Sequence, residues 1–180
     1  MTYRLDQDAD GGPVLGTARL RLRRPSRADI PASFRFWSSD RSRLMGGPWT
    51  MAQLEAETQD VFDQWARYGF GLFTVTLADS GTPIGAIGPF FPAPHPEPEL
   101  AWSLWDEAHE GQGLAHEAAI AARDWFFATT GRATAISYTD PSNHRSHRLC
   151  ARLGGVVEPD AAHPYGDEDL LVWRYARGAA

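Results

Sequence analysis

Hydrophobic and polar positions alternate over several short segments of this chain, which is the pattern of half-buried β-strands. The alternation first appears at residues 17–23, where Leu20 and Leu22 are separated by arginines. The turn residues 79–81 separate two later segments of this kind and predict a hairpin. In all we predict seven strands, at residues 17–23, 70–78, 83–91, 99–105, 134–139, 155–158 and 170–175.

Four segments carry helix signals instead, at residues 29–37, 50–69, 113–130 and 143–153. Thr50 and Gln53 form a capping box at the start of the second segment, and Gly69 supplies its stop. Strands and helices in this order predict an α/β fold, in which a mixed sheet of about seven strands has helices on both faces.

The domain organisation is predicted to be simple. Residues 1–16 are polar and glycine-rich, and we expect them to form a flexible N-terminal segment. Residues 17–180 contain no internal repeat and no linker, and their length suits one domain with a sizeable core.

Composition narrows the classes of function. The formal net charge is −6, and all 17 cationic side chains are arginines with no basic run, which argues against nucleic acid as the main partner. An acidic balance suits a cationic substrate such as an amine. Cys150 is the only cysteine, so an intramolecular disulfide and a cysteine zinc site are excluded, and we expect no metal. Since no segment reaches the ~20 apolar residues of a membrane span, we expect a cytoplasmic protein without a membrane partner.

The most informative segment is EGQGLAHEA at residues 110–118, between a predicted strand and a predicted helix. Gly111 and Gly113 allow a tight turn and a close approach of the backbone to a ligand. The start of the following helix offers free N–H groups and a positive dipole end, which suit a pyrophosphate. A plain strand-to-helix turn is the alternative interpretation.

This loop resembles the acetyl-CoA loop of the GNAT acetyltransferases, Q/R-x-x-G-x-G/A, with Glu110, Gly113 and Ala115 at its defined positions. ELAWSLW before it and NHRSHRLCARLG after it resemble the fourth strand and the last helix of the family. The opening TARLRLRRP is similar to the branch of ribosomal-protein N-terminal acetyltransferases. The resemblance covers roughly residues 17–176 and implies a sheet splayed between the family's fourth and fifth strands.

The resemblance also implies an acetyl-CoA site. Its pantetheine arm would pair with the strand backbone, its phosphates would lie on the glycine loop, and Asn143 would bind the arm, although Asn143 also fits a simple helix N-cap. Glu110 departs from the usual Gln or Arg and places a carboxylate near the phosphates, which weakens binding unless it points to solvent. The implied cofactor residues are Trp102, Ser103, Leu104, Gly111, Gln112, Gly113, Leu114, Ala115, His116 and Asn143.

An attacking amine must be neutral, so a general base is useful. Glu99 is our first candidate, with a solvated strand-end glutamate as the alternative, and His109 and His116 are its rivals. Ser146 matches a serine that the ribosomal-protein branch places near the sulfur, with an exposed helix serine as the alternative. Cys150 stands where many GNAT enzymes have an acidic tyrosine, and we interpret it as a small buried hydrophobic residue.

Three hypotheses follow. The first is an N-acetyltransferase that moves an acetyl group from acetyl-CoA to a primary amine, which is a small molecule or a protein N-terminus. The second is a catalytically silent acyl-CoA-binding or regulatory domain, and the third is an unrelated α/β module. The acceptor pocket is expected to involve residues 30–50 and 89–98. Four aromatic residues are further candidates for its lining, although core packing is the favoured interpretation of each: Trp37, Trp49, Trp65 and Phe70. The oligomeric state is open, and a homodimer is one of the states allowed.

Overall fold

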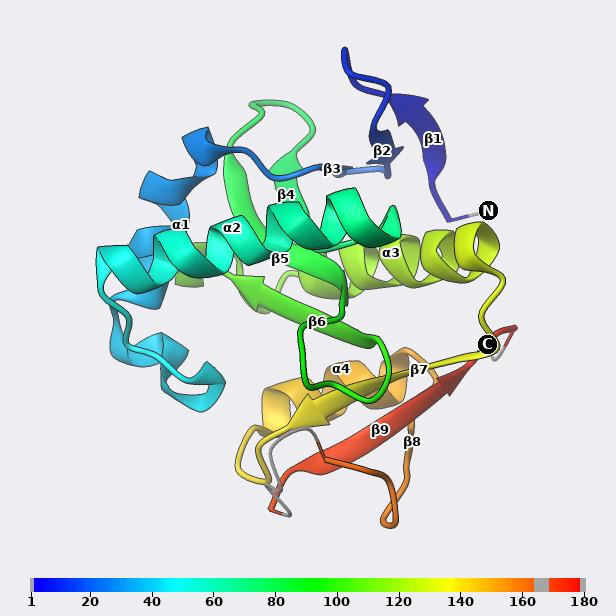
Figure 1. Cartoon of the computed structure of the whole chain (residues 1–180). Helices are drawn as coiled ribbons and strands as arrows, with labels where there is room; N and C mark the ends of the chain where they lie inside the picture. Colours follow the sequence, from blue (N-terminus) through cyan, green and yellow to red (C-terminus); the bar gives the residue numbers. More distant parts are fainter. Residues whose placement is uncertain (1, 164–168, 179–180) are drawn as a thin grey trace.

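The computed structural model describes residues 2–163 and 169–178, which form one mixed sheet with helices around it (Figure 1). The strands are β1 (Arg4–Gln7), β2 (Pro13–Gly16), β3 (Leu20–Arg23), β4 (Phe73–Leu77), β5 (Pro83–Phe90), β6 (Glu99–Leu104), β7 (Thr134–Thr139), β8 (Val156–Val157) and β9 (Leu171–Ala176). The helices are α1 (Ile30–Trp37), α2 (Met51–Tyr68), α3 (Leu114–Thr130) and α4 (His144–Arg152), with short 3-10 turns η1 (Arg27–Asp29), η2 (Asp40–Met45) and η3 (Glu107–His109).

The strand order is β1-β2-β3-β4-β5-β6-β7-β9-β8, and every neighbouring pair is antiparallel except β6 and β7. These two parallel strands share a single register pair, Glu99 with Ile136, and then diverge. The predicted splay between the family's fourth and fifth strands is therefore confirmed, and all seven predicted strands are present.

The N-terminal segment differs from the prediction. Instead of a loose segment, β1 and β2 form a hairpin at the edge of the sheet, joined by a turn in which Asp8 accepts a hydrogen bond from the N–H of Gly12 at 2.7 Å. Leu15 is fully buried and pairs with Leu22 of β3. The strands are only four residues long and flank an Asp- and Gly-rich turn, so their composition resembled that of a loop.

The sheet register separates two layers. On one face Thr74 of β4 lies beside Ala86 of β5, which lies beside Ser103 of β6; α1 and α2 cover this face. On the other face the neighbouring positions carry large hydrophobic side chains, which pack against α3 in the main core. Members of that core include Phe73, Val75, Ile87, Leu100, Leu114, Ala118, Ala122, Trp125 and Phe126.

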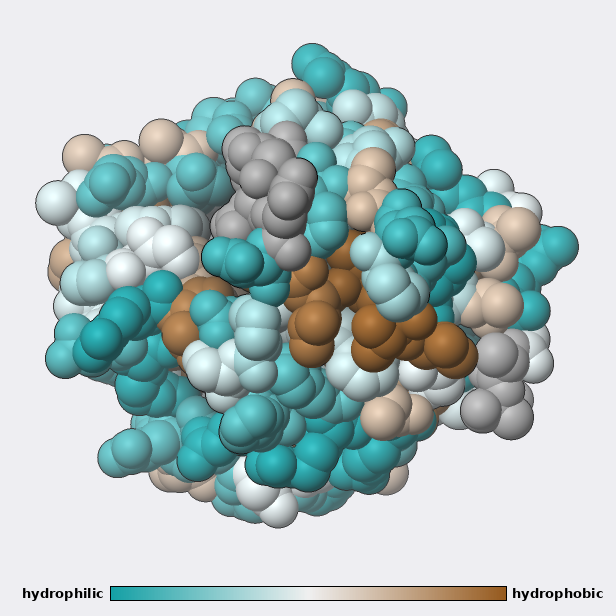
Figure 2. Space-filling model, turned by 90° about the horizontal axis from the view of Figure 1, so that it is seen from below, coloured by the Kyte–Doolittle hydropathy of each residue, from teal (hydrophilic) through white to brown (hydrophobic). Residues whose placement is uncertain are grey.

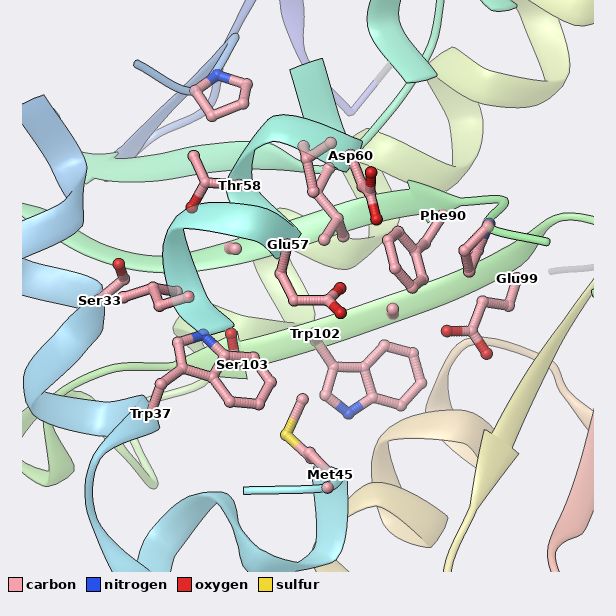
Figure 3. A pocket seen from close by; sticks show the side chains of 18 of the residues that line it. Ser33, Trp37, Met45, Glu57, Thr58, Asp60, Phe90, Glu99, Trp102 and Ser103 are labelled. Carbon is pink, nitrogen blue, oxygen red and sulfur yellow. The ribbon is translucent and has the colours of Figure 1, made fainter. Parts of the chain in front are cut away.

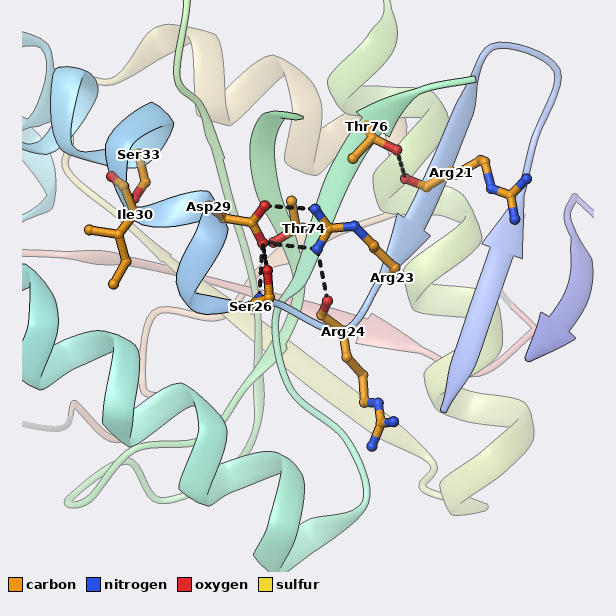
Figure 4. A network of polar contacts seen from close by, with 9 residues as sticks. All are labelled: Arg21, Arg23, Arg24, Ser26, Asp29, Ile30, Ser33, Thr74 and Thr76. Atoms are coloured by element: carbon orange, nitrogen blue, oxygen red, sulfur yellow. Dashed lines mark hydrogen bonds and ion pairs between the residues drawn. The ribbon is translucent and has the colours of Figure 1, made fainter. Parts of the chain in front are cut away.

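A buried ion pair attaches the start of α1 to the sheet (Figure 4). The carboxylate of Asp29 accepts hydrogen bonds from both terminal nitrogens of Arg23, at 2.9 and 2.6 Å, and from the hydroxyl of Thr74 at 2.9 Å. Burial opposes ionisation of Asp29, but these bonds and one from the N–H of Ser26 outweigh it and lower its pKa. The predicted helix start at Asp29 thus has a tertiary cause as well as a local one.

The molecule exposes some hydrophobic side chains. Seen from below, they gather among hydrophilic ones (Figure 2). The short edge strand β8 lies toward this lower side in Figure 1, and its Val156 and Val157 are 69% and 39% exposed. Within the described ranges, none of the helices has the length and apolar character that a bilayer crossing requires.

Candidate active site

A cavity of about 630 Å³ lies between α1, α2 and η2 on one side and the sheet on the other, next to the divergence of β6 and β7. The indole rings of Trp37 and Trp49 stack at its wall, 3.8 Å apart and nearly parallel. Further lining residues include Ser33, Leu44, Met45, Leu54, Glu57, Val61, Phe90, His95, Glu99, Ala101, Trp102, Ser103, Tyr138, Asn143 and Ser146.

The charge of the cavity is negative. Among the described residues that line it there is no arginine, whereas five carry carboxyl groups: Asp29, Glu57, Asp60, Glu99 and Asp140. Asp29 is neutralised by Arg23, but Glu57 on α2 points into the cavity toward Phe90 and Trp102 (Figure 3). Burial and the Asp60 carboxylate raise the pKa of Glu57. The cavity therefore suits a cationic or hydrogen-bond-donating guest.

Glu99 lies at the first residue of β6, where β6 and β7 make their single register pair. Its side chain reaches the cavity from the end opposite Trp37 (Figure 3). Glu99 is half-buried, and protein atoms surround its carboxyl group densely. This desolvation raises the pKa of the carboxyl to about 8, although a hydrogen bond from the backbone N–H of Tyr138 lowers it. A carboxyl with this pKa exchanges protons near neutral pH.

The backbone of β6 offers hydrogen-bonding groups to the gap beside β7. The N–H of Trp105 donates to Ile84 O at 2.8 Å, and because bonding alternates along an antiparallel pair, the N–H and C=O of Ser103 also face β5. Those of Trp102 and Leu104 face the gap. Leu104 O already accepts from Arg41 at 3.0 Å, so the free groups are mainly those of Trp102.

The glycine loop has the conformation that its sequence predicts. Gly111 and Gly113 both have positive φ, +72° and +76°, and Gly113 is the N-cap of α3. The backbone N–H groups of residues 111–116 donate no hydrogen bond within the part of the chain that the structure describes, whereas the N–H of Glu117 donates to Gly113 O. Free donors of this kind at a helix start suit an anion such as a pyrophosphate.

Glu110, directly before these donors, does not point freely to solvent. Its two carboxylate oxygens form ion pairs with Arg41 of η2, at 2.6 Å, and with Arg145 of α4. Two positively charged guanidinium groups thus surround the single negative charge of Glu110, so the loop remains suited to a phosphate.

Residues 19–156 match the protein family described as acetyltransferase (GNAT) domain. An acetyltransferase structure from Agrobacterium tumefaciens is 39% identical to this chain, with a TM-score of 0.86 over 92% of this chain and 95% of that one. A GNAT-family structure from Bordetella pertussis is 29% identical, with a TM-score of 0.76 over 91% and 99%.

The chain belongs to the GNAT acetyltransferase family. It is therefore an acetyl-CoA-dependent acetyltransferase, and acetyl-CoA is its co-substrate. A ribosomal-protein-S5-alanine acetyltransferase from Vibrio fischeri, 17% identical, shares the fold with a TM-score of 0.68 over 92% of this chain and 97% of that one. The predicted resemblance to GNAT enzymes, with ribosomal-protein acetyltransferases among the structural neighbours, is confirmed.

In the glycine loop, the side chains of Gln112 and His116 contact other protein groups, so only their backbone N–H groups are free. The side-chain amide of Gln112 donates to Ala108 O and braces the loop. The ring of His116 contacts Arg152 of α4, with Nδ1 3.0 Å from a guanidinium nitrogen. Burial and Arg152 lower the pKa of His116. Neither His109 nor His116 lines the cavity, which leaves Glu99 as the better placed of the three candidate bases.

Asn143 and Ser146 both line the cavity at the start of α4. The side-chain oxygen of Asn143 accepts from the N–H of Ser146 at 3.1 Å, so its N-cap function is present. Its amide nitrogen donates to no group within the described ranges. The Ser146 hydroxyl accepts from the indole N–H of Trp102 at 3.1 Å and keeps its own proton for another partner.

Cys150, at the position of the usual GNAT tyrosine, is fully buried and does not line the cavity. Burial raises the pKa of its thiol to about 12, and the hydroxyl of Tyr175 hydrogen-bonds with it. Its interpretation as a buried hydrophobic residue is confirmed, and its burial outside the cavity and its raised pKa argue against a role as an acid for a leaving thiolate.

Sequence reasoning missed several cavity residues. Trp37 and Trp49 line the cavity, although core packing was the favoured interpretation of each, whereas Trp65 and Phe70 pack in the core on the other side of the sheet. Glu57 was hidden among the exposed positions of an amphipathic helix, and only its place opposite the sheet distinguishes it.

Proposed function

We propose that this GNAT enzyme acetylates a primary amine bound in the cavity, by direct attack on the thioester in a ternary complex. The observation that carries the proposal is the position of Glu99, at the point where β6 and β7 diverge and at the wall of a negatively charged cavity. The acetyl donor reaches the same point through the gap between the two strands.

Glu99 acts as the general base, directly or through a water. Its pKa of about 8 means that about a tenth of the carboxyl is ionised at pH 7, and an ammonium group bound beside it increases this fraction. Proton transfer of this kind contributes roughly 10²–10⁴-fold to rate. The carboxylate accepts the proton that the amine loses as its nitrogen forms the new bond.

The remaining proposed residues hold the co-substrate. The N–H groups of residues 111–116 bind the phosphates, and the backbone of Trp102 pairs with the pantetheine arm. The amide of Asn143 and the hydroxyl of Ser146 face the same arm from α4, and Ser146 donates its free proton toward the sulfur as the thiolate leaves. Loss of one such donor typically raises the activation free energy by ~1 kcal/mol or more.

The cavity favours an amine with an apolar part. Carboxylates attract the ammonium form, and the stacked indoles with Phe90 provide contact area for hydrocarbon or an aromatic ring. A small-molecule amine and a protein N-terminus both meet these requirements, and a panel of both separates them.

The decisive experiment measures free CoA released from acetyl-CoA in the presence of single amines and N-terminal peptides, with a thiol reagent as detector. Cys150, the only cysteine, is buried, so the protein itself contributes little signal. Release that depends on an amine, with a matching acetylated product by mass spectrometry, supports the proposal. Micromolar binding of acetyl-CoA with no turnover across the panel would instead identify a silent acyl-CoA-binding domain.

We further propose one acetyltransferase domain over residues 17–180 with the N-terminal hairpin added to its sheet, a cytoplasmic location where acetyl-CoA is available, and a homodimer. Light scattering on the purified protein tests the last of these directly, since one chain has a mass of 19.9 kDa.

A further inference from the structure

Three side chains that are far apart in the sequence meet beside the phosphate loop: Arg41, Glu110 and Arg145. We call this group the Glu110 clasp. Arg41 is the fixed member, because it also donates to Trp105 O at 2.8 Å and to Leu104 O at 3.0 Å. Its guanidinium carbon lies 5.1 Å from the centre of the Phe36 ring.

Arg145 is the mobile member of the clasp by its surroundings. Its side chain is 76% exposed, whereas those of Arg41 and Glu110 are 30% and 27% exposed. Within the described ranges its guanidinium has a single partner, the second carboxylate oxygen of Glu110. Without that partner, a long side chain at the start of α4 would sample many rotamers in solvent.

The clasp adjoins the free N–H groups of the loop, since Glu110 is followed directly by Gly111. A carboxylate alone at this place repels a phosphate. The carboxylate of Glu110 is paired with two arginines, so the three side chains of the clasp together carry a net positive charge. The departure of Glu110 from the Gln or Arg expected in the loop therefore has a physical compensation.

We propose that Glu110 is a positioning residue that holds Arg145 over the glycine loop, where Arg145 binds the pyrophosphate of acetyl-CoA. The inference rests on the acetyl-CoA site of the proposed function. It assigns Arg41 the task of holding Glu110 in place, and it predicts that removal of a negative charge beside the phosphates weakens binding.

The test is calorimetric titration of the full chain with acetyl-CoA. Arg145→Met and Glu110→Gln should each raise the Kd roughly three- to tenfold, as expected for loss of one charge-assisted contact to a phosphate. The double variant should bind no more weakly than Arg145→Met alone. Arg148→Met, at an exposed arginine about one turn along the same helix, is the matched control. It should change the Kd less than about twofold, as expected for an exposed charge that has no close partner among the described residues.

Repeating the titrations with 3′-dephospho-CoA identifies the phosphate. The penalty of Arg145→Met should persist, because this ligand retains the pyrophosphate; its disappearance would overturn the assignment. Tighter or unchanged binding by Glu110→Gln, or additive penalties in the double variant, would overturn the positioning role while leaving the proposed function intact. If the wild-type protein failed to bind acetyl-CoA at all, the clasp and the cofactor site would both be wrong.

Discussion

The indole N–H of Trp102 donates a hydrogen bond to the hydroxyl of Ser146 at 3.1 Å and so connects β6 to α4 across the divergence of the sheet. Because a hydroxyl that accepts this bond still has its own proton, Ser146 can donate a hydrogen bond to a further acceptor. In the proposed function, Ser146 is the donor to the leaving sulfur of acetyl-CoA, and Trp102 holds it in place.

Ser146→Ala should therefore lower kcat roughly fivefold, the effect of one hydrogen bond worth about 1 kcal/mol, with little change in the Kd for acetyl-CoA. Steady-state kinetics and calorimetry measure the two quantities separately. Trp102→Phe keeps the ring but releases the serine, and should show a smaller loss of the same kind. An unchanged kcat in Ser146→Ala would remove the serine from the reaction.

Glu99→Gln should lower kcat/KM by roughly 10²–10⁴-fold while acetyl-CoA binding is preserved. In the wild-type protein kcat/KM should rise with pH and level off above about 8, because only the ionised carboxyl of Glu99 accepts a proton. The variant should lose this inflection. A wild-type profile with no inflection between pH 6 and 9 would assign the base elsewhere.

Ionisation of Glu99, which should raise kcat/KM, should lower the stability of the folded protein. The folded-state pKa of Glu99 is raised, so its protonated form is favoured by folding: this contribution is complete below the unfolded value of 4.5 and is lost as pH rises through about 8. Glu99→Gln, which cannot ionise, should gain stability relative to wild type as pH increases from 5 to 9. Urea denaturation at these two pH values measures the difference, and a constant difference would contradict the raised pKa.

Glu57→Gln should raise the KM for a cationic acceptor roughly two- to fivefold, as for an ion pair that is partly exposed to solvent, and leave the KM for acetyl-CoA unchanged. Glu55→Gln is the matched control, because Glu55 lies on the same helix but does not line the cavity. Equal effects of the two substitutions would reduce the role of Glu57 to the general charge of α2.

Local patterns were sufficient to predict the parts of the site that lie within one segment. Gly111 and Gly113 have the positive φ that their place before a helix suggested, and Asn143 caps α4 as its position after a turn indicated. The parity of a strand placed Glu99 and Ser103 on one face.

Contacts between distant segments could not be predicted in this way. Arg41 is 69 residues from Glu110, and nothing in the surrounding sequence of either residue indicates that they meet. The N–H and C=O of Ser103 point toward β5 because of the register in which β5 and β6 pair. The N-terminal hairpin forms because β2 pairs with the edge of β3. Both features follow from pairing with other strands rather than from local composition.

That hairpin determines where the chain can be shortened. A protein that began at residue 17 would leave β3 as the edge strand and uncover Leu22, the pairing partner of Leu15. Exposed strand edges with hydrophobic residues pair with other molecules, so this shortened protein should self-associate during purification, which size-exclusion chromatography would reveal. An N-terminal affinity tag for the experiments above should therefore precede Thr2 and leave the hairpin intact.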